Sequence, residues 1–304
     1  MSTPDERPAA AALKRTTVLT LHEKYQRGEP ISMLTAYDYP SARALDEAGI
    51  DAILVGDSLA MVVLGYPNTL SVTMDEMLHH ARAVRRGAER ALLVGDMPFM
   101  SYQADAAEAI RNAGRFLQEA GMNAVKLEGG CAVADTVRAI VQAGIPVLGH
   151  IGLTPQSSNA LGGFRVQGRT AEAARTLLED ALALEAAGCF ALVIESVPER
   201  VASFITQRLS IPTIGIGAGA GVSGQVLVTH DLLGLYDRFS PKFAKRYAEL
   251  GQAMRSAAGA YRAEVEARAF PAREHTYAMP DEEWQAFLEG VRGRRGVQPE
   301  RRRL

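Results

Sequence analysis

One pattern of residues recurs eight times between residue 31 and about residue 230, and it constrains the fold more than any other feature. A short aliphatic run ends in a polar or glycine-rich turn, and an amphipathic segment commonly follows. Short aliphatic runs bounded by glycine are typical of strands buried on both faces, as in an all-parallel sheet. The predicted strands are Ile31–Tyr37, Ala52–Gly56, Ala91–Gly95, Ala124–Leu127, Pro146–Gly149, Ala191–Ile194, Pro212–Ile216 and Gln225–Val228.

The segments between these runs have the periodicity of amphipathic helices. In Thr73–Arg86, methionine, leucine and alanine recur at helical spacing, and most of the arginines lie elsewhere. Ala104–Ala120 and Thr170–Ala187 follow the same pattern, and the second segment stops at Gly188, a residue type that commonly ends helices. The chain therefore alternates strands with helices.

Two α/β architectures accommodate such an alternation. A doubly wound open sheet usually has fewer strands, and a phosphate-binding glycine loop follows its first strand. No such loop follows Ile31–Tyr37. Eight repeats in about 200 residues fit a parallel barrel better. We therefore predict a (β/α)₈ TIM barrel with a C-terminal helical extension.

The repeat stops before the C-terminal quarter of the chain. Pro241–Arg268 predicts one or two helices, and Asp281–Glu289 predicts another. We expect residues 15–290 to form a single barrel domain that includes these helices. Residues 1–14 are polar and alanine-rich, and residues 291–304 contain six arginines and few apolar groups. Both compositions predict disordered extensions.

Composition and charge exclude several classes of protein. Of the 304 residues, 47% are hydrophobic and 22% are charged, and the formal net charge is −2. A nucleic-acid or membrane-surface binder would show a basic excess, and no apolar run approaches the roughly eighteen residues of a membrane span. Cys131 and Cys189 lack the spacing of a disulfide framework or zinc site. We expect a soluble, cytoplasmic protein.

Ionisable side chains stand at most of the predicted strand ends, where a barrel builds its active site. Taken singly, each has an ordinary explanation, because a strand-end aspartate is often a helix N-cap and a histidine can be hydrogen-bonded in a core. Seven ends with ionisable groups in aliphatic surroundings are hard to explain by packing. These residues are Asp38, Asp57, Asp96, Lys126, Glu128, His150, Glu195, His230 and Asp231.

Three carboxylates come from consecutive predicted strands and should converge on one side of the barrel mouth: Asp57, Asp96 and Glu128. Converging carboxylates repel one another unless a cation lies among them, and oxygen-only ligands favour a hard ion such as Mg²⁺. Lys126 lies two residues before Glu128, on the same face of its strand. A metal beside a fixed ammonium suits an anion with a polarisable carbonyl, such as a 2-oxo acid.

At this point the sequence resembles the ketopantoate hydroxymethyltransferase family. The resemblance covers about residues 15–280 in family order. It rests on the blocks MLTAYDYPSARALDEAGIDAILVGDS, VTMDEMLHHARAVRRGA, GDMPFMSY, VKLEGG, GHIGLTPQS, VQGR, GIGAG and LYDRFSPKF.

The resemblance implies an activity, cofactors and an assembly. A hydroxymethyl group would pass from 5,10-methylenetetrahydrofolate to 3-methyl-2-oxobutanoate, giving 2-dehydropantoate for pantothenate and coenzyme A synthesis. It also implies one Mg²⁺ per subunit and a homo-oligomer, commonly a decamer.

The resemblance also implies roles for site residues. Glu195 would be the general base, and Asp57, Asp96 and Glu128 would hold the metal. The residues implied for substrate binding are Asp57, Ser58, Asp96, Lys126 and His150.

Two questions stay open at this level. His150 rivals Glu195 as the base, because the ordinary pKa of histidine is near neutrality. The activity also has rivals: an Mg²⁺-dependent lyase or mutase of the phosphoenolpyruvate mutase and isocitrate lyase kind, and a non-catalytic metabolite-binding barrel. Those lyases usually carry a loop cysteine or serine after a lysine-glycine motif, which this sequence lacks.

Overall fold

The computed structural model describes residues 15–238 and 241–292. Eight parallel strands follow one another in sequence order around a closed barrel, and β1 pairs with β8 to complete it. The predicted (β/α)₈ barrel is therefore confirmed. The strands are β1 Ile31–Thr35, β2 Ala52–Val55, β3 Leu92–Asp96, β4 Ala124–Glu128, β5 Val147–Gly152, β6 Ala191–Glu195, β7 Thr213–Ile216 and β8 Gly224–Leu227.

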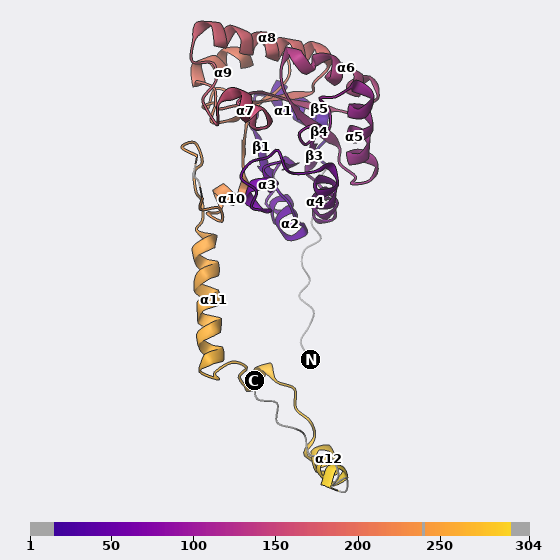
Figure 1. Cartoon of the computed structure of the whole chain (residues 1–304), viewed down its shortest axis with the longest axis vertical. Helices are drawn as coiled ribbons and strands as arrows, with labels where there is room; N and C mark the ends of the chain where they lie inside the picture. The colour runs from indigo at the N-terminus through magenta and orange to yellow at the C-terminus, as the bar shows by residue number, and fades with distance from the viewer. Residues whose placement is uncertain (1–14, 239–240, 293–304) are drawn as a thin grey trace. The chain divides into compact units, whose positions relative to one another are not determined.

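Helices surround the barrel (Figure 1). Those up to residue 238 are α1 Val18–Gln26, α2 Tyr39–Glu47, α3 Leu59–Val62, α4 Met74–Gly87, α5 Ala106–Gln118, α6 Ala134–Gln142, α7 Ser158–Leu161, α8 Ala171–Ala187, α9 Glu199–Thr206 and α10 Thr229–Leu232. Two short 3₁₀ helices, η1 Cys131–Val133 and η2 Pro155–Ser157, lie in the loops after β4 and β5.

Local sequence signals explain where the main helices begin and end. α4 starts with a capping box, in which the Glu76 backbone N–H donates to Thr73 Oγ1 and the Glu76 carboxylate accepts from the Thr73 backbone. α8 ends at Gly188, which takes the left-handed conformation with φ of 102°. The helix boundaries predicted from the sequence at these positions are confirmed.

Successive residues of a strand pack in two different apolar clusters, one inside the barrel and one between the strands and the surrounding helices. On β3, Leu92 and Val94 pack with Met33 in a cluster made almost entirely of strand residues, which is the barrel interior. Leu93 packs instead in the cluster that contains helix residues such as Phe116. Because strand side chains alternate between faces, this register decides which later residues point into the barrel.

Chain contacts divide the protein into two units, one ending at Glu249 and the other beginning at Leu250. The second unit contains α11 Leu250–Glu266, η3 Arg273–His275 and α12 Asp281–Arg292, and none of its described residues is buried. The helix predicted within Pro241–Arg268 is thus shorter than that segment.

The extensions predicted at residues 1–14 and 291–304 lie outside the described residues, apart from the two that end α12. Of the described helices, none is long and apolar enough to cross a membrane.

Candidate active site

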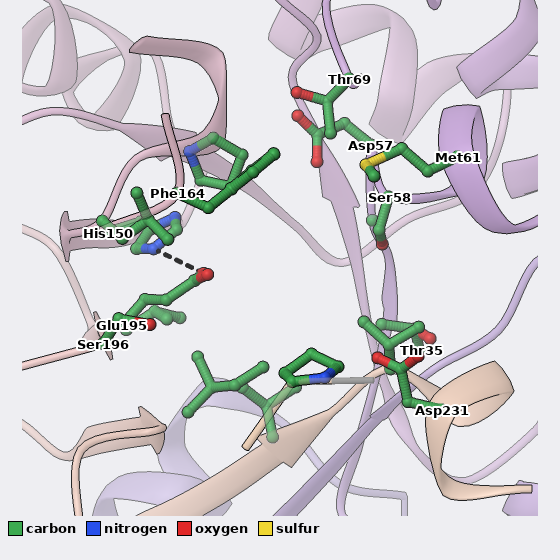
Figure 2. Close-up of a pocket in the computed structure, with 18 of the residues that line it drawn as sticks. Thr35, Asp57, Ser58, Met61, Thr69, His150, Phe164, Glu195, Ser196 and Asp231 are labelled. Atoms are coloured by element: carbon green, nitrogen blue, oxygen red, sulfur yellow. Dashed lines mark ion pairs between the residues drawn. The ribbon is translucent and has the colours of Figure 1, made fainter. Parts of the chain in front are cut away.

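A cavity of about 390 Å³ opens at the carboxyl ends of the strands. It brings together all seven residues that the sequence analysis assigned to the site: Asp57, Ser58, Asp96, Lys126, Glu128, His150 and Glu195. Figure 2 shows Asp57 and Ser58 on one side of the cavity, with His150 and Glu195 on the other.

Strand periodicity places five of these side chains inside the barrel. Val94 and Ala124 belong to the interior cluster, and Asp96 and Lys126 follow each of them by two residues. Glu128 follows Lys126 by two more. The same spacing takes Leu148 to His150 on β5 and Val193 to Glu195 on β6. The apolar interior of the barrel therefore ends in a layer of ionisable groups.

A buried lysine lies at the centre of the carboxylate side. Lys126 Nζ is 2.8 Å and 2.9 Å from the two oxygens of Asp96, and 3.6 Å from Glu128 Oε1. The Asp57 backbone N–H donates to Asp96 Oδ2 over 3.1 Å. All four residues are at most 4% exposed. β2, β3 and β4 thus meet in one network of charges.

These groups shift one another's protonation. Burial, followed by repulsion from Asp96 and Glu128, raises the pKa of Asp57 well above its ordinary value. Burial alone would lower the pKa of Lys126, but the surrounding carboxylates outweigh it and raise that pKa. Lys126 is therefore charged at neutral pH, whereas burial and the neighbouring carboxylates disfavour the ionised form of Asp57.

His150 stands between two carboxylates. Its Nδ1 is 3.4 Å from Glu128 Oε1 and its Nε2 is 3.3 Å from Glu195 Oε2. Neither ring nitrogen meets full hydrogen-bond geometry, so these are loose ionic contacts. Burial and Lys126 lower the pKa of His150, but Glu128 and Glu195 outweigh them and raise it to about 9. The imidazole is accordingly protonated near neutral pH.

Ser58 has a defined partner behind the cavity. Its Oγ lies 2.9 Å from the hydroxyl of Tyr37, whose side chain is buried and packs its ring against His230. Burial raises the pKa of Tyr37, so this hydroxyl stays neutral. The Ser58 hydroxyl is therefore held at the cavity wall by a neutral partner.

Not every ionisable strand end belongs to the site. Asp38 caps α2 by accepting a 2.8 Å hydrogen bond from the Ser41 backbone, as the N-cap explanation predicts. Asp231 lines the cavity, where burial raises its pKa to about 6 against the opposing effect of Arg246.

Sequence reasoning missed Gln156 and Tyr102. The Gln156 side chain is 4% exposed and its Nε2 donates to Asp57 Oδ2 over 3.0 Å. The Tyr102 hydroxyl contacts both Gln156 Oε1, at 2.8 Å, and the Glu128 backbone. Both residues lie in blocks that carry the family resemblance, but no spacing rule links positions so far apart in the chain.

The outer part of the cavity is mainly apolar. Phe164 and Phe243 line it and are 50% and 36% exposed. Arg165 and Lys242 also line it, and neither forms an ion pair within the part of the chain that the structure describes. The cavity thus has a charged, buried floor and an open aromatic mouth with two cations.

The donor set fits a hard divalent cation. In residues 15–238 and 241–292, no three His, Cys, Asp or Glu side chains are arranged to hold a metal unaided. Mg²⁺ commonly takes only one or two carboxylates and keeps several waters, so Asp57 and Asp96 would suffice. Buried Glu128 Oε1 also lacks a hydrogen-bond partner. Three buried carboxylates face one ammonium, and an added cation would reduce their repulsion.

Solved structures with similar folds are distant in sequence. The phosphoenolpyruvate phosphomutase of Streptomyces platensis subsp. rosaceus has a TM-score of 0.58 and 16% identity, covering 91% of this chain and 98% of that one. A 2,3-dimethylmalate lyase has a TM-score of 0.55 and 18% identity, covering 91% and 99%. At this identity the likeness shows the fold alone.

Sequence relatives are much closer. A protein of Oleidesulfovibrio alaskensis named 3-methyl-2-oxobutanoate hydroxymethyltransferase is 60% identical over 263 residues, covering 86% of this chain and 91% of that relative. Its counterpart in Syntrophobacter fumaroxidans is 61% identical over 251 residues, covering 83% and 89%. The family description "ketopantoate hydroxymethyltransferase" matches residues 15–273. This chain therefore belongs to the ketopantoate hydroxymethyltransferase family of transferases.

Proposed function

We propose that the chain transfers a hydroxymethyl group from 5,10-methylenetetrahydrofolate to 3-methyl-2-oxobutanoate, giving 2-dehydropantoate. The observation that carries the proposal is the division of one cavity into a buried carboxylate and lysine cluster and a facing His150–Glu195 pair. The cluster suits a 2-oxo acid, and the facing carboxylate suits removal of a proton. Pantothenate and coenzyme A synthesis in the cytoplasm would use this product.

Asp57 and Asp96 would hold Mg²⁺, with Glu128 completing its shell. When bound there, the metal would polarise the keto group of the substrate and make its C3 proton more acidic. Lys126 would remain charged beside Asp96 and attract the substrate carboxylate. Ser58 would contribute a hydroxyl whose orientation Tyr37 holds.

Glu195 would remove the C3 proton. It faces the Asp57 side across the cavity (Figure 2), and its side chain is less buried than those of the carboxylate cluster. His150 is the weaker candidate because each of its ring nitrogens already faces a carboxylate. We assign His150 to the substrate site, where an imidazolium would orient the Glu195 carboxylate.

The open mouth would receive the folate. Phe164 and Phe243 offer faces for a pterin or benzoyl ring, and Arg165 and Lys242 are cations for the glutamate carboxylates. One of the two carbon–nitrogen bonds of the methylene carbon would first break, with a proton going to the released nitrogen, and C3 of the deprotonated substrate would bond to the resulting iminium carbon. Water would then supply the hydroxyl group as the second carbon–nitrogen bond breaks and tetrahydrofolate leaves.

Two alternatives make different predictions. A lyase or mutase would split or rearrange its 2-oxo acid without folate, and a binding barrel would produce nothing. The purified chain, Mg²⁺, 3-methyl-2-oxobutanoate and 5,10-methylenetetrahydrofolate should yield 2-dehydropantoate and tetrahydrofolate in equal amounts, measured by mass spectrometry. Turnover without folate, or none under any condition, would contradict the proposal. Light scattering would test the homo-oligomer, with a decamer expected from the family resemblance.

A further inference from the structure

Gln156 connects more parts of the site than any other uncharged side chain described above. It lies in η2, in the loop that follows β5. Its backbone N–H donates to Glu128 Oε2 over 3.0 Å, while its side-chain Nε2 donates to Asp57 Oδ2, also over 3.0 Å. One residue thereby contacts the carboxylates at the ends of both β2 and β4.

The orientation of this amide is determined by its neighbours. Nε2 also donates to the Met97 carbonyl, which can only accept, so the nitrogen must lie on that side. Oε1 accepts from the Tyr102 hydroxyl at 2.8 Å and from Gln103 Nε2 at 3.2 Å. Both amide N–H groups and the carbonyl oxygen therefore have partners, and the group cannot rotate without breaking several of them.

The amide leaves one Asp57 oxygen available. Gln156 takes Oδ2, whereas Oδ1 accepts no hydrogen bond from the described residues. At Glu128 the backbone N–H of Gln156 takes Oε2, and Oε1 is the oxygen left without a hydrogen bond. In both carboxylates the same residue occupies one oxygen, and the other accepts no hydrogen bond, although Glu128 Oε1 lies within ion-pair distance of Lys126 and His150.

The same loop forms part of the cavity wall. Leu153 and Pro155 precede Gln156 and line the cavity, as do Phe164 and Val166 further along. Gln156 is the buried point at which this wall joins the carboxylate floor. A change at Gln156 should consequently reach both the carboxylates and the loop.

We propose that Gln156 is a positioning residue that fixes the carboxylates of Asp57 and Glu128 in the rotamers that bind the divalent cation. The inference rests on the metal site of the proposed function. Gln156 does not line the cavity, so it would contact neither metal nor substrate. Partners that orient ligating side chains typically affect metal affinity by about 10-fold to 100-fold when they are removed.

Gln156→Met tests the proposal, because methionine keeps the length of the side chain and removes its donors and acceptor. Mn²⁺ binding to the full chain without substrate, followed by electron paramagnetic resonance, should weaken by about 10-fold to 100-fold. Gln207→Met is the matched control, since Gln207 lies just after α9 and is exposed. Its Mn²⁺ affinity should equal that of the parent.

A second variant keeps the test decisive if Gln156→Met does not fold. Tyr102→Phe leaves Gln156 in place and removes the hydroxyl that contacts both Gln156 Oε1 and the Glu128 backbone. We expect a smaller loss of Mn²⁺ affinity, about 3-fold to 10-fold, with the fold retained. A lower Tm with unchanged Mn²⁺ affinity in the folded variants would show a purely structural role and overturn the proposal. Absence of Mn²⁺ binding by the parent would overturn the metal assignment as well.

Discussion

The two sides of the cavity differ in how tightly hydrogen bonds hold their charged side chains. On the β2–β4 side, Asp57, Asp96 and Lys126 share hydrogen bonds of 2.8–3.1 Å with one another's side chains and backbone. On the β5–β6 side, His150 meets its two carboxylates at 3.3–3.4 Å without full hydrogen-bond geometry. The first side is fixed before a ligand arrives, whereas the second can still adjust to one.

The difference matches what each side would do. A cation and an anionic substrate are held best by groups whose orientation needs no rearrangement on binding. A proton-transfer base must instead move between two hydrogen-bonding arrangements as it gains its proton. The comparison therefore predicts that substitutions on the fixed side act on binding, whereas on the loose side replacement of the proposed base, Glu195, acts on the chemical step.

The largest effect is expected at Asp57. Asp57→Asn should reduce Mg²⁺ binding and turnover to background, because an amide is a neutral and poorer ligand. The same change should raise the Tm in metal-free buffer at pH 8. Burial and repulsion from Asp96 and Glu128 raise the pKa of Asp57, so its ionised form destabilises the fold, and asparagine removes that charge. Calorimetry measures both quantities. Unchanged Mg²⁺ affinity would remove Asp57 from the metal site.

Glu195→Gln tests the loose side directly. Exchange of the C3 proton of 3-methyl-2-oxobutanoate for deuterium, followed by NMR without folate, reports proton removal alone. Its rate should fall by about 10²-fold to 10⁴-fold, the usual contribution of a positioned base, while substrate binding changes little. His150→Gln is the comparison variant and should mainly weaken binding. If exchange persists in Glu195→Gln and stops in His150→Gln, the two roles are reversed.

Lys126→Met tests whether a substitution on the fixed side weakens substrate binding. Loss of the ammonium removes a charged hydrogen bond worth about 1.5–3 kcal/mol, so the Kd of the 2-oxo acid should rise by about 10-fold to 100-fold. The variant should also be less stable by about 3–5 kcal/mol, because Asp96 and Glu128 lose their buried partner. Urea unfolding measures the second effect. A Kd equal to the parent's would make Lys126 a purely structural residue.

The smallest effect concerns Asp231, at the cavity wall outside both sides. Its pKa of about 6 lies above the ordinary value of 3.8. As pH rises between these values, the unfolded chain loses its proton first, so folding stability falls and the cost is complete above pH 6. Asp231→Asn should therefore stabilise the fold, with a gain that grows from about pH 4 to about pH 6 and is constant above that. The gain should be at most about 1 kcal/mol, because solvent screens a half-buried group. A gain that is independent of pH would have another cause.

Local sequence determined much of this protein. Each strand and its preceding turn are encoded within a few residues, so eight aliphatic runs predicted the closed barrel. Because side chains alternate along a strand, the spacing from Lys126 to Glu128 already placed both on one face. The strand ends differed by up to three residues: Asp96, Glu128 and Glu195 finish their strands one residue later than predicted, β1 ends two residues earlier, at Thr35, and β5 ends three residues later, at Gly152.

Only the tertiary structure decided how the charged groups pair. Lys126 takes Asp96 as its close partner rather than Glu128, and His150 lies between two carboxylates from its neighbouring strands. The link from Gln156 to Asp57 joins residues 99 positions apart. Such contacts depend on closure of the whole barrel and on the path of the loop after β5. Local periodicity indicates which face of a strand a side chain lies on and whether it is buried. It does not indicate which distant atoms come within hydrogen-bond distance.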